Sequence, residues 1–228
     1  MGPGISLRRE NTEEKVYRSI IRSILHGEIR PGEFLLEEEL STRLNVSRTP
    51  VSRSLMRLVS EGFLEKLPKK GCFVPIPTPQ DAEQVYRARM IVETMTAADA
   101  AKLAEDDEIA ELERLVAMDQ DAAVSLDKES YSNINEALHL GIARMARNAY
   151  LERWCRYIFW RSNLYIFYLD SFYIARENSD VQPQKTPWDH KEIVEAIRKR
   201  DSFAAQEAMR RHLEHTYIAL FGGEHCNV

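Results

Sequence analysis

Apolar residues near the start of the chain recur at helical spacing and are then interrupted by turn residues. Val16, Ile20 and Ile24 fall on one face of a first helix. Gly27 and the Pro31-Gly32 pair mark its end and the turn that follows. The pattern therefore predicts an amphipathic helix that needs further elements to cover its apolar face.

Two more helices are expected in close succession. The first is short and spans about 37–44. The second begins after Ser47, which can serve as its N-cap, and ends near Gly62. Its inward face carries three apolar residues: Val51, Leu55 and Leu58. This order of elements predicts a helix-turn-helix.

Two short strands are expected next, at about 63–67 and 72–75, on either side of a Pro68-Lys69-Lys70-Gly71 turn. They complete a winged helix-turn-helix of three helices and a β-hairpin wing. The stretch from Val74 to Pro79 then has prolines at alternate positions, which exclude a helix and favour an extended connector. A domain boundary is expected here.

The rest of the chain is helical in pattern, opening with Thr78 as N-cap and Pro79 at the first helical position. Helices are expected at about 79–104, 106–123, 127–146, 149–175, 188–199 and 202–221, with a polar loop at about 177–187. The expected fold class is mainly α, with the following parts: a winged helix-turn-helix (10–76), a linker (77–80), an all-α bundle of about six helices (81–221) and a tail (222–228).

Charge changes at the same boundary. The net charge is -5, but residues 1–80 hold 13 basic and 10 acidic residues, whereas residues 81–228 hold 18 and 26. A basic module joined to an acidic one is compatible with a nucleic-acid binder.

The three widely spaced cysteines support neither a disulfide framework nor a thiolate zinc site. No apolar run approaches the roughly 20 residues that cross a bilayer. We expect a soluble, cytoplasmic protein without membrane contact.

The helix after Ser47 has a polar and basic first turn, as a DNA-reading helix requires. The hydroxyls of Ser47 and Thr49, together with the helix N-terminus, can bind phosphate, and Arg48 can pair with O6 and N7 of guanine. The alternative is an amphipathic unit whose polar side chains only face solvent. Agreement of the helix, turn, cap and wing in order and spacing favours DNA binding.

A set of turn, apolar and polar residues within 13–75 also carries a family resemblance. The set is Pro31-Gly32, Leu40, Val46-Ser47-Arg48-Thr49-Pro50-Val51, Leu55, Leu58, Glu61-Gly62 and Gly71. It resembles the N-terminal domain of the GntR family of regulators. The resemblance implies that Ser47, Arg48 and Thr49 contact DNA from the recognition helix, with Lys70 and Gly71 at the wing tip.

The chain departs from the family pattern directly after the Pro-Val pair. The family usually has arginine there, whereas this chain has Ser52 and then Arg53, which points about 100° further round the helix. The base preference is therefore not expected to follow that of relatives. The expected DNA contacts are Arg43, Ser47, Arg48, Thr49, Ser52, Arg53, Lys70 and Gly71.

Four residues of the acidic part have side chains that suit a metal ion. Asn135 and His139 lie four apart on one helix face and could offer an amide oxygen and an imidazole. His190 and His212 follow on later helices, and spacing alone does not show that they meet. Taken singly, each histidine is more often a hydrogen-bonded helix residue than a ligand.

A second resemblance covers residues 81–221. It is carried by Arg89 with Glu93, Asn135 to His139, Asn148, Asp189-His190, Ile193, Ala196-Ile197, Asp201, Ala208-Met209 and His212-Leu213. These residues look like the all-helical effector domain of the FadR-type branch of the GntR family, called FCD. Many members bind a divalent metal through one carboxylate and three histidines, with an organic-acid effector beside it.

Carried over to this chain, the resemblance implies Asn135, His139, His190 and His212 as metal ligands. Asn135 replaces the more usual aspartate and removes one negative charge, but three imidazoles suit Zn, Ni or a similar ion. Arg89 is expected either to clamp an effector carboxylate or to form an i,i+4 pair with Glu93.

Nine aromatic residues lie between 154 and 173, which is more than one face of a helix can bury. They are Trp154, Tyr157, Phe159, Trp160, Tyr165, Phe167, Tyr168, Phe172 and Tyr173. Most are expected in the core, and the surplus is expected in an effector cavity or a dimer interface.

The leading functional hypothesis is a transcription regulator. Repression is the commoner behaviour in the GntR family, so we expect a repressor. It would bind a palindromic DNA operator as a homodimer and respond to a small carboxylate effector. One alternative is a metal-dependent enzyme with a DNA-binding appendage, but HExxH, a nucleophile elbow and a phosphate-binding glycine loop are all absent from the sequence. We therefore expect no enzymatic activity. The other alternative is an architectural DNA protein that has no ligand.

Overall fold

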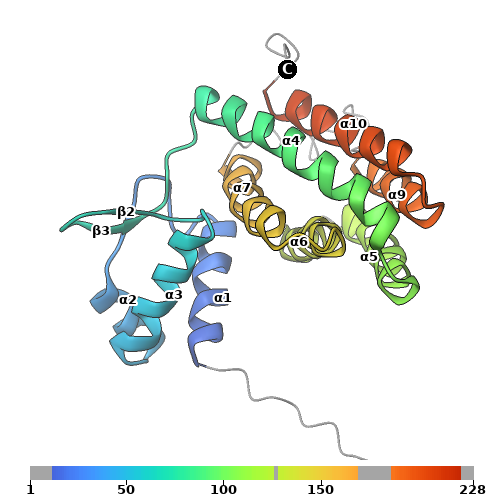
Figure 1. The fold of residues 1–228 in the computed structure, drawn as a ribbon. Helices are drawn as coiled ribbons and strands as arrows, with labels where there is room; N and C mark the ends of the chain where they lie inside the picture. Colours follow the sequence, from blue (N-terminus) through green and yellow to red (C-terminus); the bar gives the residue numbers. More distant parts are fainter. Residues whose placement is uncertain (1–11, 126–127, 169–185, 222–228) are drawn as a thin grey trace, which may run out of the picture. The chain divides into compact units, whose positions relative to one another are not determined.

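The computed structural model describes residues 12–125, 128–168 and 186–221 (Figure 1). The chain divides into two compact units, Met1–Ile76 and Pro77–Val228. Most of the loop expected at 177–187 and all of the tail at 222–228 lie outside the described residues; positions 186 and 187 of that loop are helical. None of the described helices is long and apolar enough to cross a membrane.

The first unit contains three helices and a small sheet. Its elements are α1 (Thr12–Leu25), β1 (Phe34–Leu35), α2 (Glu37–Leu44), α3 (Arg48–Ser60), β2 (Glu65–Leu67) and β3 (Gly71–Phe73). The winged helix-turn-helix expected from the sequence is confirmed. Its core includes Ile20 and Ile24 of α1 and Leu55 and Leu58 of α3, each at most 1% exposed.

The sheet is antiparallel and has the strand order β1-β3-β2. Leu35 of β1 lies opposite Cys72 of β3, and Leu67 of β2 lies opposite Gly71. The wing strands are shorter than expected, because Phe63 is a fully buried residue of the turn after α3 rather than a strand residue. β1 was not expected at all, since two residues are too few to show strand alternation.

The turn between α2 and α3 is a Schellman motif. Asn45 adopts a left-handed conformation with φ of 51° and donates its N–H to the carbonyl of Thr42, while Val46 donates to Ser41. Ser47 occupies the N-cap position of α3, but its side chain makes no capping hydrogen bond. The expected capping role of the Ser47 hydroxyl is therefore not seen.

The second unit is a bundle of six described helices. They are α4 (Pro79–Leu103), α5 (Asp106–Ser125), α6 (Lys128–Met145), α7 (Ala149–Tyr168), α9 (Thr186–Arg198) and α10 (Ser202–Phe221). All six expected helices are found. The Thr78 side chain caps α4 by accepting a hydrogen bond from the N–H of Asp81, with Pro79 in the first turn, as expected.

Small side chains on α4 allow its neighbours to pack closely. Ala97, Ala100 and Ala101 are fully buried in a core shared with Ile193 of α9 and Leu213 of α10. The distance between the axes of two packed helices depends on the side chains at their contact, so these alanines allow neighbouring helices to lie close to α4. Figure 1 shows α10 running alongside α4, with α6 and α7 on the other side. Polar residues from these helices therefore meet inside the bundle.

Candidate functional site

The first turn of α3 presents the three residues that the sequence singled out for DNA contact. Ser47, Arg48 and Thr49 are all exposed. Arg48 forms an ion pair of 3.0 Å with Glu38 of α2, and the two side chains are 63% and 75% exposed. A pair this exposed contributes little free energy and can be exchanged for a phosphate or a base. The first-turn amides of α3 also lack a capping side chain.

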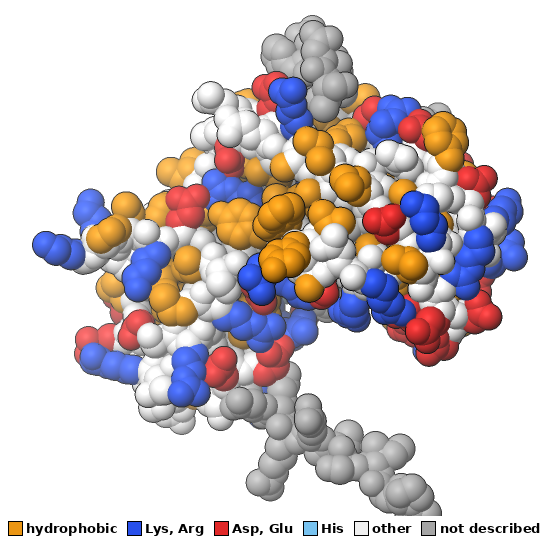
Figure 2. Space-filling model, viewed as in Figure 1, with side chains coloured by type: hydrophobic (Ala, Val, Ile, Leu, Met, Phe, Trp, Pro, Cys, Tyr) orange, Lys and Arg blue, Asp and Glu red, His pale blue; other side chains and the backbone are white. Residues whose placement is uncertain are grey.

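The remaining expected DNA contacts lie around this turn and on the wing. Arg43 of α2 and Arg53 of α3 are exposed, and Arg53 lies 3.8 Å from Glu13 of α1. Ser52 is half-buried. Lys70 is exposed in the hairpin turn before Gly71, whose φ of 107° suits glycine. Figure 2 shows basic side chains at the tip of the β2–β3 hairpin.

By contrast, the partly buried Arg57 of α3 is held by contacts within the first unit. Its guanidinium bonds to Glu14 and Glu61 and stacks over the Tyr17 ring at 3.7 Å. Arg57 is therefore a structural residue, although it lies on the same helix as Arg48 and Arg53.

Three histidines from three helices meet in the interior of the second unit. His139 of α6, His190 of α9 and His212 of α10 are each at most 2% exposed, and one ring nitrogen of each lies within 4.8 Å of the others. The Nε2 atoms of His139 and His212 are 3.2 Å apart. The structure thus brings together three of the four residues expected to bind metal. In the sequence, His139 and His190 are 51 positions apart, and His190 and His212 are 22 positions apart.

A buried carboxylate fixes the orientation of the His139 ring. The Nδ1 atom of His139 lies 2.5 Å from Oε2 of Glu93, which is also paired with Arg89. Burial lowers the pKa of His139 to about 4, against the opposing effect of Glu93, so the ring is neutral near pH 7. With Nδ1–H donated to Glu93, the Nε2 lone pair points towards His212.

Arg89 forms the i,i+4 pair with Glu93 that was one of its two expected roles. Its Nε and Nη2 atoms donate to the two Glu93 oxygens, and Nη1 donates to Ser162 of α7 at 3.1 Å. Burial alone would raise the pKa of Glu93, but Arg89 and His139 hold that pKa well below its ordinary value. The positive and negative charges of this pair therefore balance inside the bundle.

His190 and His212 are oriented differently. Nδ1 of His190 lies 2.8 Å from Oδ2 of Asp119 on α5, and both residues are fully buried. Nδ1 of His212 lies 3.9 Å from Asp189, beyond hydrogen-bonding distance. Burial lowers the pKa of His212 well below its ordinary value, so this ring is also neutral. Nε2 of His190 and Nδ1 of His212 have no hydrogen-bond partner among the described residues.

The cluster has the chemistry of a metal site. Zn–N bonds are about 2.0–2.1 Å, so two nitrogens on one tetrahedral ion are about 3.3 Å apart, close to the distance between His139 and His212. The buried, unpartnered Nε2 of His190 supplies a third lone pair. Asn135 is buried one turn before His139 on α6. The side chains present therefore fit a borderline divalent ion better than a hard one.

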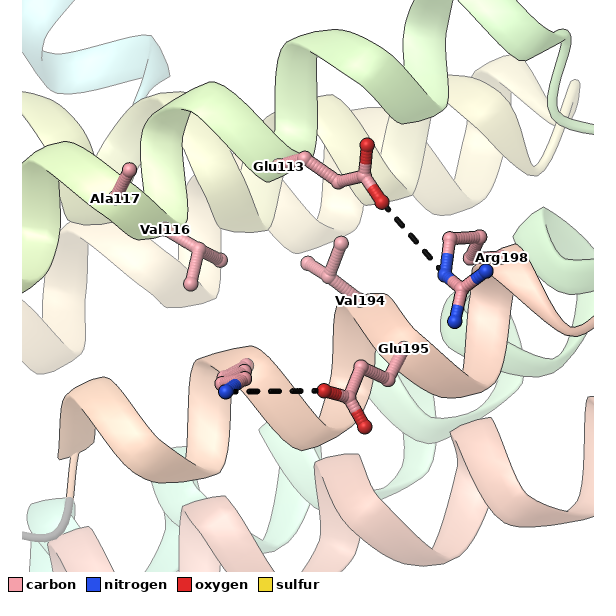
Figure 3. Close-up of a pocket in the computed structure, with 7 residues that line it drawn as sticks. Glu113, Val116, Ala117, Val194, Glu195 and Arg198 are labelled. Carbon is pink, nitrogen blue, oxygen red and sulfur yellow. Dashed lines mark ion pairs between the residues drawn. The ribbon is translucent and has the colours of Figure 1, made fainter.

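A surface groove of about 420 Å³ lies between α5 and α9, outside this cluster (Figure 3). Val116 and Val194 form its apolar floor, and Glu113 of α5 pairs with Arg198 of α9 at 3.7 Å. Exposed ion pairs of this kind contribute little. α5 and α9 also form a buried polar contact, the pair between Asp119 and His190, away from this groove.

Sequence analysis missed Asp119 and Ser162. Asp119 follows Leu112 and Val116 at i, i+4 and i+7, so an acidic residue stands at an apolar position of α5. That break in the pattern was the available signal. Ser162 gives no signal, because a serine within an aromatic helix is not unusual.

The two units match two family models. Residues 12–74 match the model described as bacterial regulatory proteins, gntR family, and residues 84–215 match the FCD domain. Among solved structures, E. coli McbR/YncC has a TM-score of 0.74 over 92% of this chain and 97% of that chain, at 21% identity. That similarity shows the fold.

Curated relatives extend over both units. An uncharacterized HTH-type transcriptional regulator in an unstable DNA locus of Streptomyces ambofaciens is 30% identical over 211 residues, covering 87% of this chain and 80% of that protein. The HTH-type transcriptional repressor RspR of Escherichia coli (strain K12) is 25% identical over 203 residues, covering 88% and 85%. These relatives are transcription regulators and not enzymes. The chain belongs to the gntR family of bacterial regulatory proteins and carries an FCD domain as its second unit.

Proposed function

We propose that this regulator is a repressor that binds a palindromic operator as a homodimer and responds to a small carboxylate effector bound beside a divalent metal. The observation that carries the effector part is the buried histidine cluster, which has two ring nitrogens without a partner among the described residues. The repressor assignment draws on RspR, which is named as a transcriptional repressor.

DNA reading is assigned to α3, the end of α2 and the wing. The contact set is Arg43, Ser47, Arg48, Thr49, Ser52, Arg53, Lys70 and Gly71. Within it, Arg48 is the base-reading candidate because it is exposed at the helix N-terminus and is engaged only by a surface carboxylate. Uncapped amides of the first turn can bind a phosphate, which would set the position of the helix in the groove.

A mobility-shift assay of Arg48→Ala on the operator tests this assignment. Loss of a bidentate base contact costs about 1–3 kcal/mol, equivalent to roughly 5-fold to 150-fold weaker binding. Arg114→Ala is the matched control, because it removes a similarly exposed arginine from α5. If the two variants bind the operator equally well, Arg48 is not a base contact.

The metal is assigned to His139, His190 and His212, with Asn135 as the fourth candidate ligand. When bound, a divalent ion would supply a positive centre able to coordinate an effector carboxylate oxygen. Arg89 is the candidate for holding the rest of that carboxylate. Three of its five N–H donors already bond to Glu93 and Ser162, so it would contact the effector while keeping its pair with Glu93.

Elemental analysis of the purified protein, together with thermal shifts in small carboxylic acids, tests the ligand part. We expect about one metal ion per chain and a higher melting temperature with one class of carboxylate, since a ligand that binds the folded state stabilises it. His212→Ala should lose the metal. Protein without metal, and without a stabilising carboxylate, would instead support an architectural DNA protein.

Dimerisation is assigned to an exposed apolar face of the second unit. Tyr150, Trp154 and Tyr157 recur at i, i+4 and i+7 on α7 and are 47–71% exposed, and Ile91 and Met95 of the neighbouring α4 are 60% and 48% exposed. Figure 2 shows hydrophobic side chains gathered over α7 and the adjoining part of α4. Exposed aromatic patches of this kind are typical of interfaces.

Sedimentation of wild type and Trp154→Glu tests the interface. A dimer presents two recognition helices to half-sites about 34–36 Å apart, so the variant should sediment as a monomer and bind a palindromic operator more weakly. Trp188→Glu is the control, because Trp188 is similarly exposed but lies on α9. A dimer that survives Trp154→Glu would exclude this face.

A further inference from the structure

The pair formed by Asp119 and His190 is a buried polar contact of the histidine cluster that includes no arginine or lysine among the described residues. Asp119 is fully buried, its Oδ2 accepts from Nδ1 of His190, and its Oδ1 has no partner in the described part of the chain. Its only ion-pair partner there is His190. A buried carboxylate left in this state is unfavourable unless a positive charge is close.

Two other buried carboxylates lie beside the cluster. Asp189 lies 3.9 Å from Nδ1 of His212 and bonds to His215, and Glu93 differs from Asp119 in its partners. Glu93 also holds a histidine ring, but its charge is neutralised by Arg89 on the same helix. Asp119 has no arginine or lysine partner in the described part of the chain, and the group it pairs with there is the His190 ring.

The same contact selects the tautomer of His190. An ionised carboxylate only accepts hydrogen bonds, so Nδ1 of His190 must carry the proton and Nε2 must carry the lone pair. The His190 ring lies 4.5 Å from that of His212 and 5.4 Å from that of His139, measured between centroids. One ring nitrogen of His190 lies within 4.8 Å of a ring nitrogen of each of the other two histidines. Nε2 of His190 has no hydrogen-bond partner among the described residues.

We propose that Asp119 is a positioning residue for the metal: it fixes His190 in the ligating tautomer and supplies the negative charge that three imidazoles and Asn135 do not. This inference rests on the proposed metal site. Carboxylates that hold a ligating histidine commonly change metal affinity by about 10-fold to 100-fold when removed.

Two substitutions separate the two roles. Asp119→Asn keeps an oxygen that accepts from Nδ1 but removes the charge, whereas Asp119→Leu removes both. Zinc affinity, measured by competition with a chromophoric chelator, should fall about 10-fold in Asp119→Asn and about 100-fold in Asp119→Leu. Glu111→Gln removes a carboxylate from the exposed face of the same helix and should leave zinc affinity unchanged.

Nitrogen NMR of the metal-free proteins reports which ring nitrogen of His190 carries the proton. A purely structural role of Asp119 would not change that result. Wild type and Asp119→Asn should show His190 protonated at Nδ1, and Asp119→Leu should lose that preference. Circular dichroism identifies a variant that fails to fold, and the isosteric Asp119→Asn then carries the test.

The outcomes distinguish this proposal from the one it rests on. If wild type binds no zinc, the proposed metal site is wrong and this proposal falls with it. If wild type binds zinc and Asp119→Asn binds it equally tightly, the metal site stands and the role of Asp119 is wrong. Graded loss in the two variants, with Glu111→Gln unchanged, supports both.

Discussion

Glu93→Gln should destabilise the helical unit far more than the loss of an ordinary ion pair. The Arg89 and Glu93 side chains are 2% and 1% exposed, so water cannot solvate the remaining charge when the pair is broken. Two Glu93 oxygens face Nε and Nη2 of Arg89 and Nδ1 of His139. Glutamine would place an NH₂ group against these donors and leave the Arg89 charge uncompensated.

The expected cost is about 3–5 kcal/mol, the range for a buried pair that loses one partner. For a unit of this size, that corresponds to a fall in melting temperature of about 6–20 °C. A double substitution, Arg89→Met with Glu93→Leu, should recover part of this loss because no buried charge remains. Its residual cost should be about 1–3 kcal/mol, from the His139 N–H that has lost its acceptor.

Tryptophan fluorescence isolates the relevant transition. All three tryptophans, Trp154, Trp160 and Trp188, lie in the helical unit, so urea titration followed by fluorescence reports on that unit alone. A chelator should be present, so that metal binding does not contribute to the measured stability.

The surface offers a matched control for this experiment. Glu214→Gln breaks an i,i+4 pair with Arg210 of the same spacing, in which the side chains are 30% and 43% exposed, and it should cost less than 1 kcal/mol. The reasoning is refuted if Glu93→Gln costs no more than this control, or if the double substitution is as damaging as the single one.

Three further outcomes are expected. In the metal-free protein, the folded pKa of His139 of about 4 lies below its unfolded value, so its contribution to stability is complete above about pH 6.5 and is lost as pH falls towards 4. Urea titrations across that window should show the decline, and His139→Gln should make it smaller without abolishing it, because the pKa of His212 is lowered as well. Leu58→Ala, at a fully buried position of α3, should cost about 2–5 kcal/mol and should shift the circular dichroism transition of the first unit while leaving the fluorescence transition in place. Lys70→Ala should weaken operator binding uniformly across sequences and reduce the slope of log affinity against log salt by about 1, whereas an unchanged slope would remove Lys70 from the phosphate contacts.

Much of the DNA-binding unit could be predicted because its signals are local. The apolar spacing of Val51, Leu55 and Leu58, the position of Ser47 and the turn at Gly71 act within a few residues of one another, and the structure places helices and hairpin where they indicate. The strand β1 could not be predicted, since Phe34 and Leu35 become a strand only when β3 pairs with them.

The helical unit shows the same division between local and long-range information. Helix bounds follow from periodicity and caps, so the residue order alone is enough to place six helices and to put Asn135 and His139 on one face. Whether His139, His190 and His212 meet depends on how the three helices that carry them pack, and no spacing within one helix carries that information.

Tertiary structure also decided which partner each buried polar group takes. The sequence left Arg89 with two possible roles, and the fold satisfied it with Glu93 and Ser162 because a buried guanidinium requires a nearby carboxylate. It also placed Asp119 against His190, 71 positions away. A buried charge must find its partner in three dimensions, whereas a helix finds its hydrogen bonds along the chain, and for that reason the sequence predicts the helices but not the contacts between them.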